Sequence, residues 1–192
     1  MADNEAGAPI VGKLDASLGS PGFFSVPDLI TGISVGPSGQ IFVATDTHIY
    51  DYTSDGALLR QFRLIGGGGV LGDLAFDGAT LFVADNAPGN PIVGKLDASL
   101  GVLGFFSVPD LITGMSVGPS GQVFVATDTH IYDYTSDGAL LGQFRLIGGG
   151  GGLGDLAFDA GAVPTVPEPS TALLLIIGLI GVVATSRSLR GI

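Results

Sequence analysis

The side chains that could do acid–base or metal chemistry are few, and the two histidines come first. His48 and His130 are the only histidines of the 192-residue chain, and each ends a Thr-Asp-Thr-His sequence. An imidazole can act as a general base or as a metal ligand. A metal centre needs several ligands together, and no carboxylate cluster flanks either histidine in the sequence. We therefore expect a polar role at a strand end for both, with metal binding as the alternative.

Aspartates and tyrosines alternate around these histidines. The residues are Asp51, Asp55, Asp133 and Asp137 with Tyr50, Tyr52, Tyr132 and Tyr134. Paired carboxylates can exchange protons with a substrate. However, Asp55 and Asp137 precede Gly, where Asp commonly stabilises a turn through local hydrogen bonds. A calcium loop is not matched, because the middle ligand and the later Glu are missing. We therefore expect Asp55 and Asp137 to have a structural role in turns.

Two glycine runs, residues 66–69 and 148–152, could in principle cradle a phosphate. No Lys-Ser or Lys-Thr follows either run, so neither is a P-loop. The chain also lacks the G-x-S-x-G and H-E-x-x-H patterns of hydrolases and zinc peptidases. Near-identical repeats suit a multivalent surface better than an asymmetric catalytic centre. We therefore expect no enzymatic activity, no cofactor and no metal.

The charge of the chain restricts its partners. The net charge is −11, and the residues before Pro164 carry 17 acids against 5 bases. Such a protein repels nucleic acid, because phosphate binding needs clustered Lys and Arg. The absence of cysteine excludes disulfides and thiol catalysis. The N-terminus has neither the basic start nor the apolar core of a secretory signal peptide, which favours a reading frame truncated upstream.

The chain contains a long internal repeat. Residues 9–77 align without gaps on 91–159, at an offset of 82, and 63 of the 69 positions are identical. Each unit splits again into two similar halves, "ISVGPSGQIFVATDTHIYDYTSDGALLRQF" at 33–62 and "LAFDGATLFVADNAPGNPIVGKLDASLGVLGFF" at 74–106. Each half reads as four short strands separated by Gly, Pro and Asp-Gly turns. The repeat unit is therefore two four-stranded meanders.

Four antiparallel strands in about 40 residues indicate a β-propeller blade. The run Gly-Pro-Ser-Gly-Gln-Ile/Val-Phe-Val-Ala-Thr-Asp, with the following Tyr-rich strand and "SDGALL", resembles the blades of NHL-type propellers. We expect an all-β, propeller-like array of about four blades over residues 1–161. Whole meanders are expected at 33–62, 74–106 and 115–144.

The start of the chain falls inside a blade. Met1–Asn4 matches Val83–Asn86, the second strand of a meander. A fourth blade could form if a strand at Leu156–Phe158 joined the N-terminal strands at Ile10–Leu14 and Pro21–Phe24. A fragment of a larger propeller, an open stack, and a β-sandwich or solenoid remain alternatives.

The C-terminal part differs from the repeats. Residues 162–170 are a Pro-rich linker, and a short apolar run extends from Ala172 to Thr185. A transmembrane helix needs about 20 mostly apolar residues, and this apolar run is shorter. A helix over 171–192 would therefore span a bilayer only marginally. Arg187 and Arg190 follow, and the positive-inside rule keeps them cytoplasmic. A buried core helix and a plain tail anchor are the alternatives.

This tail resembles a PEP-CTERM sorting signal. The motif Val166, Pro167, Glu168 and Pro169 precedes the apolar segment, and Arg187 and Arg190 close it. The resemblance implies recognition at the motif by an exosortase, with the basic residues as the membrane stop. It also implies transient residence in the inner membrane with the body outside the cytoplasm, then delivery to the cell surface or extracellular matrix.

The combined expectation is an exported, non-enzymatic binding protein. Its partners would be the exosortase, the membrane through the C-terminal helix, and extracellular polysaccharide or surface proteins, but not nucleic acid. The alternatives are a lactonase- or lyase-like propeller enzyme with a metal in the central channel, which some propellers of similar blade type are, and a truncated fragment of a larger propeller.

Overall fold

The computed structural model describes residues 1–4, 9–14, 17, 19, 22–63, 69–145 and 156. Chain contacts divide the protein into the units Met1–Phe158 and Asp159–Ile192, and all described residues belong to the first. The expected linker 162–170 and helix 171–192 lie outside them, as does the closing strand at Leu156–Phe158 except for Leu156. In the part of the chain that is described, no helix is long and apolar enough to cross a bilayer.

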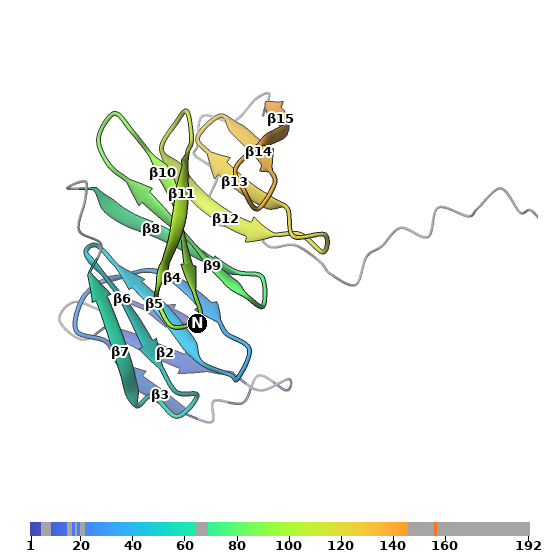
Figure 1. The fold of residues 1–192 in the computed structure, drawn as a ribbon. Coiled ribbons are helices and arrows are strands. Elements are labelled where there is room, and N and C mark those ends of the chain that lie inside the picture. Colours follow the sequence, from blue (N-terminus) through green and yellow to red (C-terminus); the bar gives the residue numbers. More distant parts are fainter. Residues whose placement is uncertain are drawn as a thin grey trace, which may run out of the picture. The chain divides into compact units, whose positions relative to one another are not determined.

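The described residues form four antiparallel sheets in chain order, and Figure 1 labels their strands from β2 to β15. Sheet 1 has three strands and sheets 2, 3 and 4 have four each. Sheet 1 contains β1 (Ala2–Asp3), β2 (Ile10–Lys13) and β3 (Gly22–Ser25). Sheet 2 contains β4 (Ile30–Val35), β5 (Ile41–Thr45), β6 (His48–Tyr52) and β7 (Leu58–Arg63). Sheet 3 contains β8 (Val70–Phe76), β9 (Thr80–Asn86), β10 (Ile92–Asp97) and β11 (Val102–Ser107). Sheet 4 contains β12 (Ile112–Val117), β13 (Val123–Thr127), β14 (His130–Tyr134) and β15 (Leu140–Arg145).

The three whole meanders predicted from the repeat are confirmed as sheets 2, 3 and 4. The mid-blade start is confirmed as well. In sheet 1, Ala2 pairs with Val11, and one repeat unit later Ala84 pairs with Val93 in sheet 3. Sheet 1 therefore corresponds to the last three strands of sheet 3, and sheet 2 corresponds to sheet 4.

The first strand of each meander is longer than the sequence predicts. β4 begins at Ile30 rather than Ile33, and β8 begins at Val70 rather than Leu74. The pairing register shifts between Ile30 and Gly32 and between Leu71 and Leu74. An extra residue in one strand breaks the alternation of inward and outward side chains, which hides the strand from a period-2 reading.

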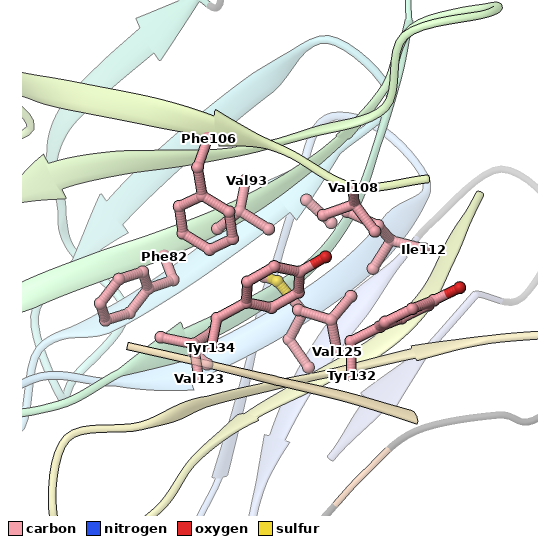
Figure 2. Packing of buried hydrophobic residues seen from close by; sticks show 12 residues of the cluster. Phe82, Val93, Phe106, Val108, Ile112, Val123, Val125, Tyr132 and Tyr134 are labelled. Carbon is pink, nitrogen blue, oxygen red and sulfur yellow. The ribbon is translucent and has the colours of Figure 1, made fainter. Parts of the chain in front are cut away.

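A separate hydrophobic cluster joins each pair of consecutive sheets. One joins sheets 1 and 2 around Val11 and Tyr52, and its equivalent joins sheets 3 and 4 around Val93 and Tyr134. Figure 2 shows the second, in which the rings of Phe106 and Tyr134 lie 5.0 Å apart. We call this the odd-to-even interface. A blade's side chains point to both faces of its sheet, so each blade needs a neighbour on either side.

A different cluster joins sheets 2 and 3. Phe42, Ala44 and Ile49 of sheet 2 pack against sheet 3, and all three are fully buried. The sheet 3 members are Leu71, Leu74, Leu81, Val83, Leu96 and Leu100. We call this the even-to-odd interface. Consecutive sheets thus meet through two alternating kinds of contact, which explains why the sequence period covers two blades.

Asparagine side chains connect sheet 1 to sheet 2 and sheet 3 to sheet 4, at the starts of β4 and β12. The Asn86 side chain donates to the Ile112 carbonyl at 2.9 Å and accepts from its N–H at 2.8 Å. Asn4 makes the same two bonds with Ile30, both at 2.8 Å. Each asparagine thus makes two hydrogen bonds, which satisfy backbone groups that the bulged strand ends would otherwise leave unpaired.

Candidate functional site

A set of three side chains occurs twice, in sheets 2 and 4. The Tyr50 hydroxyl donates to Asp28 Oδ2 at 3.2 Å, and Tyr132 donates to Asp110 Oδ2 at the same distance. The imidazole of His48 stacks on Tyr50 with ring centroids 5.7 Å apart, and the second copy repeats this at 5.5 Å. We call these the Asp–Tyr–His sets. Their members are Asp28, Tyr50 and His48, and Asp110, Tyr132 and His130.

The local sequence explains this geometry. His48 and Tyr50 are two positions apart on β6, so their side chains share one face of the sheet. Asp28 lies just before β4 and is exposed, while Tyr50 is buried except for 4% of its surface. Burial first, and then the bond to Asp28, raise the pKa of Tyr50, so the phenol is neutral and donates at neutral pH.

The predicted strand-end role of the histidines agrees with the structure. The His48 N–H donates to Thr45 Oγ1 at 3.2 Å, and His48 Nδ1 lies 2.8 Å from Thr47 Oγ1. His130 makes the equivalent contacts with Thr127 and Thr129. No group of three or more His, Cys, Asp or Glu side chains that could hold a metal occurs among the described residues.

The predicted turn role of the aspartates needs a correction. Asp55 and Asp137 do lie in turns next to glycines with positive φ. The side chain that bonds within the first turn is Thr53, whose Oγ1 accepts the Ala57 N–H at 3.0 Å. Asp137 instead pairs with Lys95 of the preceding sheet at 3.0 Å, and Asp55 pairs with Lys13 at 3.8 Å. The sequence did not show these pairs because the two residues of each pair belong to different sheets and are far apart along the chain.

Asp85, which sequence reasoning missed, is a buried acid at the end of β9. It is 4% exposed, and its Oδ1 has no hydrogen-bond partner among the described residues. Burial raises its pKa, while the Ala87 N–H acts in the opposite direction. It lines a cavity of about 310 Å³ together with Phe62, Lys95 and Phe105. The sequence did contain a signal: Asp85 takes the place of a threonine that the equivalent positions of sheets 2 and 4 keep, as Thr45 and Thr127.

A second cavity, of about 410 Å³, lies among the first strands of the sheets. Thr31 of β4, Thr113 of β12 and Asp73 of β8 line it. The Oγ1 atoms of both threonines are buried, and in the described part of the chain they have no hydrogen-bond partner. The Asp73 carboxylate accepts the Met115 N–H of sheet 4 at 2.7 Å. Hydroxyls and a carboxylate suit a polar occupant.

Most residues of the glycine runs and all six predicted sorting residues lie outside the described residues. The six are Val166, Pro167, Glu168, Pro169, Arg187 and Arg190. Gly69 is described, and a Cβ there would collide with Asp85 and the backbone of Ala87. This glycine therefore permits a close approach of two backbone segments.

No known family's sequence profile matches the chain, and no curated protein matches it in sequence. Its fold is similar to that of virginiamycin B lyase from Staphylococcus aureus, with a TM-score of 0.61 and 18% identity over 79% of this chain and 53% of the lyase. A streptogramin B lyase matches with a TM-score of 0.58 and 20% identity over 76% and 50%. The WD40 domain of Neurospora crassa Pan2 matches with 0.58 and 13% over 74% and 47%. The chain thus spans about half the length of these proteins.

These similarities correct one expectation. We expected the repetition and the missing motifs to indicate a protein without enzymatic activity. Virginiamycin B lyase is an enzyme with a similar fold, so that argument does not hold for this architecture. At such low identity the likeness shows the fold alone, and that fold is all-β and propeller-like.

Proposed function

We propose that the chain is an exported propeller-like protein that binds polysaccharide at the cell surface or in the extracellular matrix. One observation carries this proposal. The Asp–Tyr–His set is present in two copies, with Tyr–Asp bonds of 3.2 Å in each. Two equal sites on one body bind a repeating polymer far more tightly than one site does, because the second contact is intramolecular.

The chemistry of the sets suits sugar hydroxyls. Asp28 and Asp110 are exposed carboxylates that accept hydrogen bonds, and the half-buried imidazoles of His48 and His130 add ring surface. The net charge of −11 disfavours an acidic polymer. A neutral polysaccharide is therefore the proposed ligand, and a basic surface protein is the alternative.

Export is proposed from the tail. The Val166–Pro169 motif would be recognised by an exosortase while the apolar segment holds the body at the inner membrane. Arg187 and Arg190 would act as the membrane stop, as positive charges do on the cytoplasmic side. The body would then reach the cell surface or extracellular matrix.

Co-sedimentation with an insoluble neutral polysaccharide tests the binding role. Asp28→Asn and Asp110→Asn should each weaken binding moderately, and the double variant should lose at least about tenfold. Asp55→Asn is the matched control, since it removes one exposed charge of sheet 2 outside the set. Binding of the double variant at the wild-type level would contradict the proposal.

Mass spectrometry of exported protein tests the sorting role. In a host that has an exosortase, the mature chain should end near Pro169, and Glu168→Ala should keep the intact tail on the protein. Exported material that still ends at Ile192 would count against sorting by this route. That result would leave the binding role of the body unaffected.

Asp85 favours a second candidate function, proton transfer in an elimination reaction. A buried carboxyl with a raised pKa beside a cavity is a candidate general base. The lyases with a similar fold make this class worth testing. Incubation with virginiamycin B should then consume it, and Asp85→Asn should abolish the turnover. No turnover by the wild-type chain would exclude that substrate.

A further inference from the structure

The sheet 2 face of the even-to-odd interface occurs a second time in this chain, and part of the sheet 3 face does as well. The interface forms between sheets 2 and 3, and the sequence repeat makes sheet 4 equivalent to sheet 2 and sheet 1 equivalent to the last three strands of sheet 3. We propose that sheet 4 of one chain docks on sheet 1 of a second copy. The contact would reproduce the part of the even-to-odd interface that Val83 of β9 and Leu96 of β10 make, and two such contacts would close a head-to-tail dimer.

On sheet 4, the counterparts of large apolar residues that the interface covers in sheet 2 are less buried. Ile49 is fully buried in sheet 2, whereas the identical Ile131 is partly exposed. Phe62 is partly buried against the cluster, whereas Phe144 is 63% exposed. The residue types are unchanged, so the difference in burial comes from what covers each face.

On sheet 1, the opposite face shows the same difference. Val83 is fully buried in sheet 3, and its equivalent Met1 is 71% exposed. Leu96 is 2% exposed, and its equivalent Leu14 is 51% exposed. Large apolar side chains so exposed on two complementary faces favour an association that covers both.

Two pairs of equivalent residues outside this interface give an internal control. Tyr52 and its equivalent Tyr134, both in odd-to-even interfaces, are each 4% exposed. Leu58 and its equivalent Leu140 lie on the surface in both copies, at 51% and 53%. Sheet 4 is therefore not generally less well packed than sheet 2.

A second copy is the occupant that fits these faces. Sheet 1 of another chain presents the counterparts of the last three strands of sheet 3, which sheet 2 already binds. The chain also covers only 53% of the lyase with the similar fold, so two copies supply about one such length. A head-to-tail contact either closes into a ring or continues as a filament, and a similar propeller of that length favours closure at two.

Sedimentation of the full chain in mild detergent tests this. The wild type should have about twice the protein mass of one 19.3 kDa chain. Phe144→Asp and Leu14→Asp should each weaken the dimer at least about tenfold, because each buries a charge without a partner. Leu140→Asp is the matched control on the same strand as Phe144 and should remain dimeric. Circular dichroism confirms that every variant is folded.

Mixing the two variants separates this dimer from other assemblies. Leu14→Asp chains keep an intact sheet 4 face, and Phe144→Asp chains keep an intact sheet 1 face. The mixture should therefore regain dimers through one intact interface, although neither variant dimerises alone.

Three results would overturn the proposal. A monomeric wild type with both variants thermally destabilised would show that one chain closes on itself. Dimers unaffected by both variants would place the contact outside these two faces. Disruption by Phe144→Asp alone would indicate a face-to-face contact between two sheet 4 surfaces.

Discussion

Asp51 and Arg60 form an ion pair across β6 and β7, with Arg60 Nη2 3.2 Å from Asp51 Oδ2. Asp51 is fully buried, and its burial raises the pKa of the carboxyl while Arg60 lowers it. The second copy has no such pair, because Gly142 occupies the position of Arg60. In both copies Oδ1 of the aspartate is buried and lacks a hydrogen-bond partner among the described residues, so the difference is the Arg60 pair of Asp51 Oδ2. The chain therefore contains the same carboxylate with and without its cation.

The first prediction uses this difference. Arg60→Gly should lower the free energy of unfolding by about 1–3 kcal/mol, because it leaves a buried carboxylate without its charged partner. Gly142→Arg should raise the unfolding free energy, since a Cβ at Gly142 meets nothing within 4 Å and the new guanidinium can pair with Asp133. Urea unfolding measures both. Gly142→Ala is the control for the change in backbone entropy, and an equal effect of Ala and Arg would contradict the ion-pair explanation.

The second prediction concerns pH and Asp85. Its pKa is raised above the ordinary 3.8, so the folded state holds this proton more tightly than the unfolded chain does. Its contribution to stability is therefore fully present below the unfolded value of 3.8 and is lost as the pH rises through the folded pKa. Asp85→Asn should stabilise the protein at pH 7, and the gain should shrink as the pH falls towards 4. Thermal melting across this range measures it, and a gain independent of pH would contradict the assignment.

The third prediction compares two turn glycines of sheet 4. Gly138 and Gly121 have backbone φ angles of 88° and 77°, which residues with a side chain rarely adopt. A Cβ at Gly138 would collide with Phe106 of sheet 3, whereas one at Gly121 meets nothing within 4 Å. Gly121→Ala should cost about 1–2 kcal/mol for the backbone conformation alone. Gly138→Ala should cost clearly more in chemical unfolding, and equal costs would show that the odd-to-even interface yields easily.

The fourth prediction tests the asparagine bonds between sheets 3 and 4. Asn86→Ala should destabilise the protein by about 1–3 kcal/mol, because the Ile112 N–H and carbonyl both lose their partner. Asn86→Asp keeps an acceptor for the N–H but places a carboxylate oxygen against the Ile112 carbonyl, so its cost should not be smaller. Hydrogen exchange at Ile112 should increase in both variants. Unchanged exchange would mean that water replaces the side chain at no cost.

The sequence predicted much of the fold for a physical reason. Turn residues such as Gly39 and Gly56 fix where each strand ends, and both have the positive φ that favours glycine. The repeat then located every meander. The start of β8 was missed because the bulge near Gly72 interrupts alternation, a result of contacts with neighbouring strands. The Asp–Tyr–His sets were only partly seen, since Asp28 is distant from Tyr50 along the chain and meets it through tertiary packing.

The alternation of two interfaces has a consequence for how such a protein can change in length. Removing sheet 3, for example, would place the Phe62 face of sheet 2 against the Tyr134 face of sheet 4. Neither face would then meet the kind of surface that it packs against now. Adding or removing a full repeat unit preserves every contact. Natural variants of different size should therefore differ by pairs of blades, because the two-blade repeat unit is gained or lost as a whole.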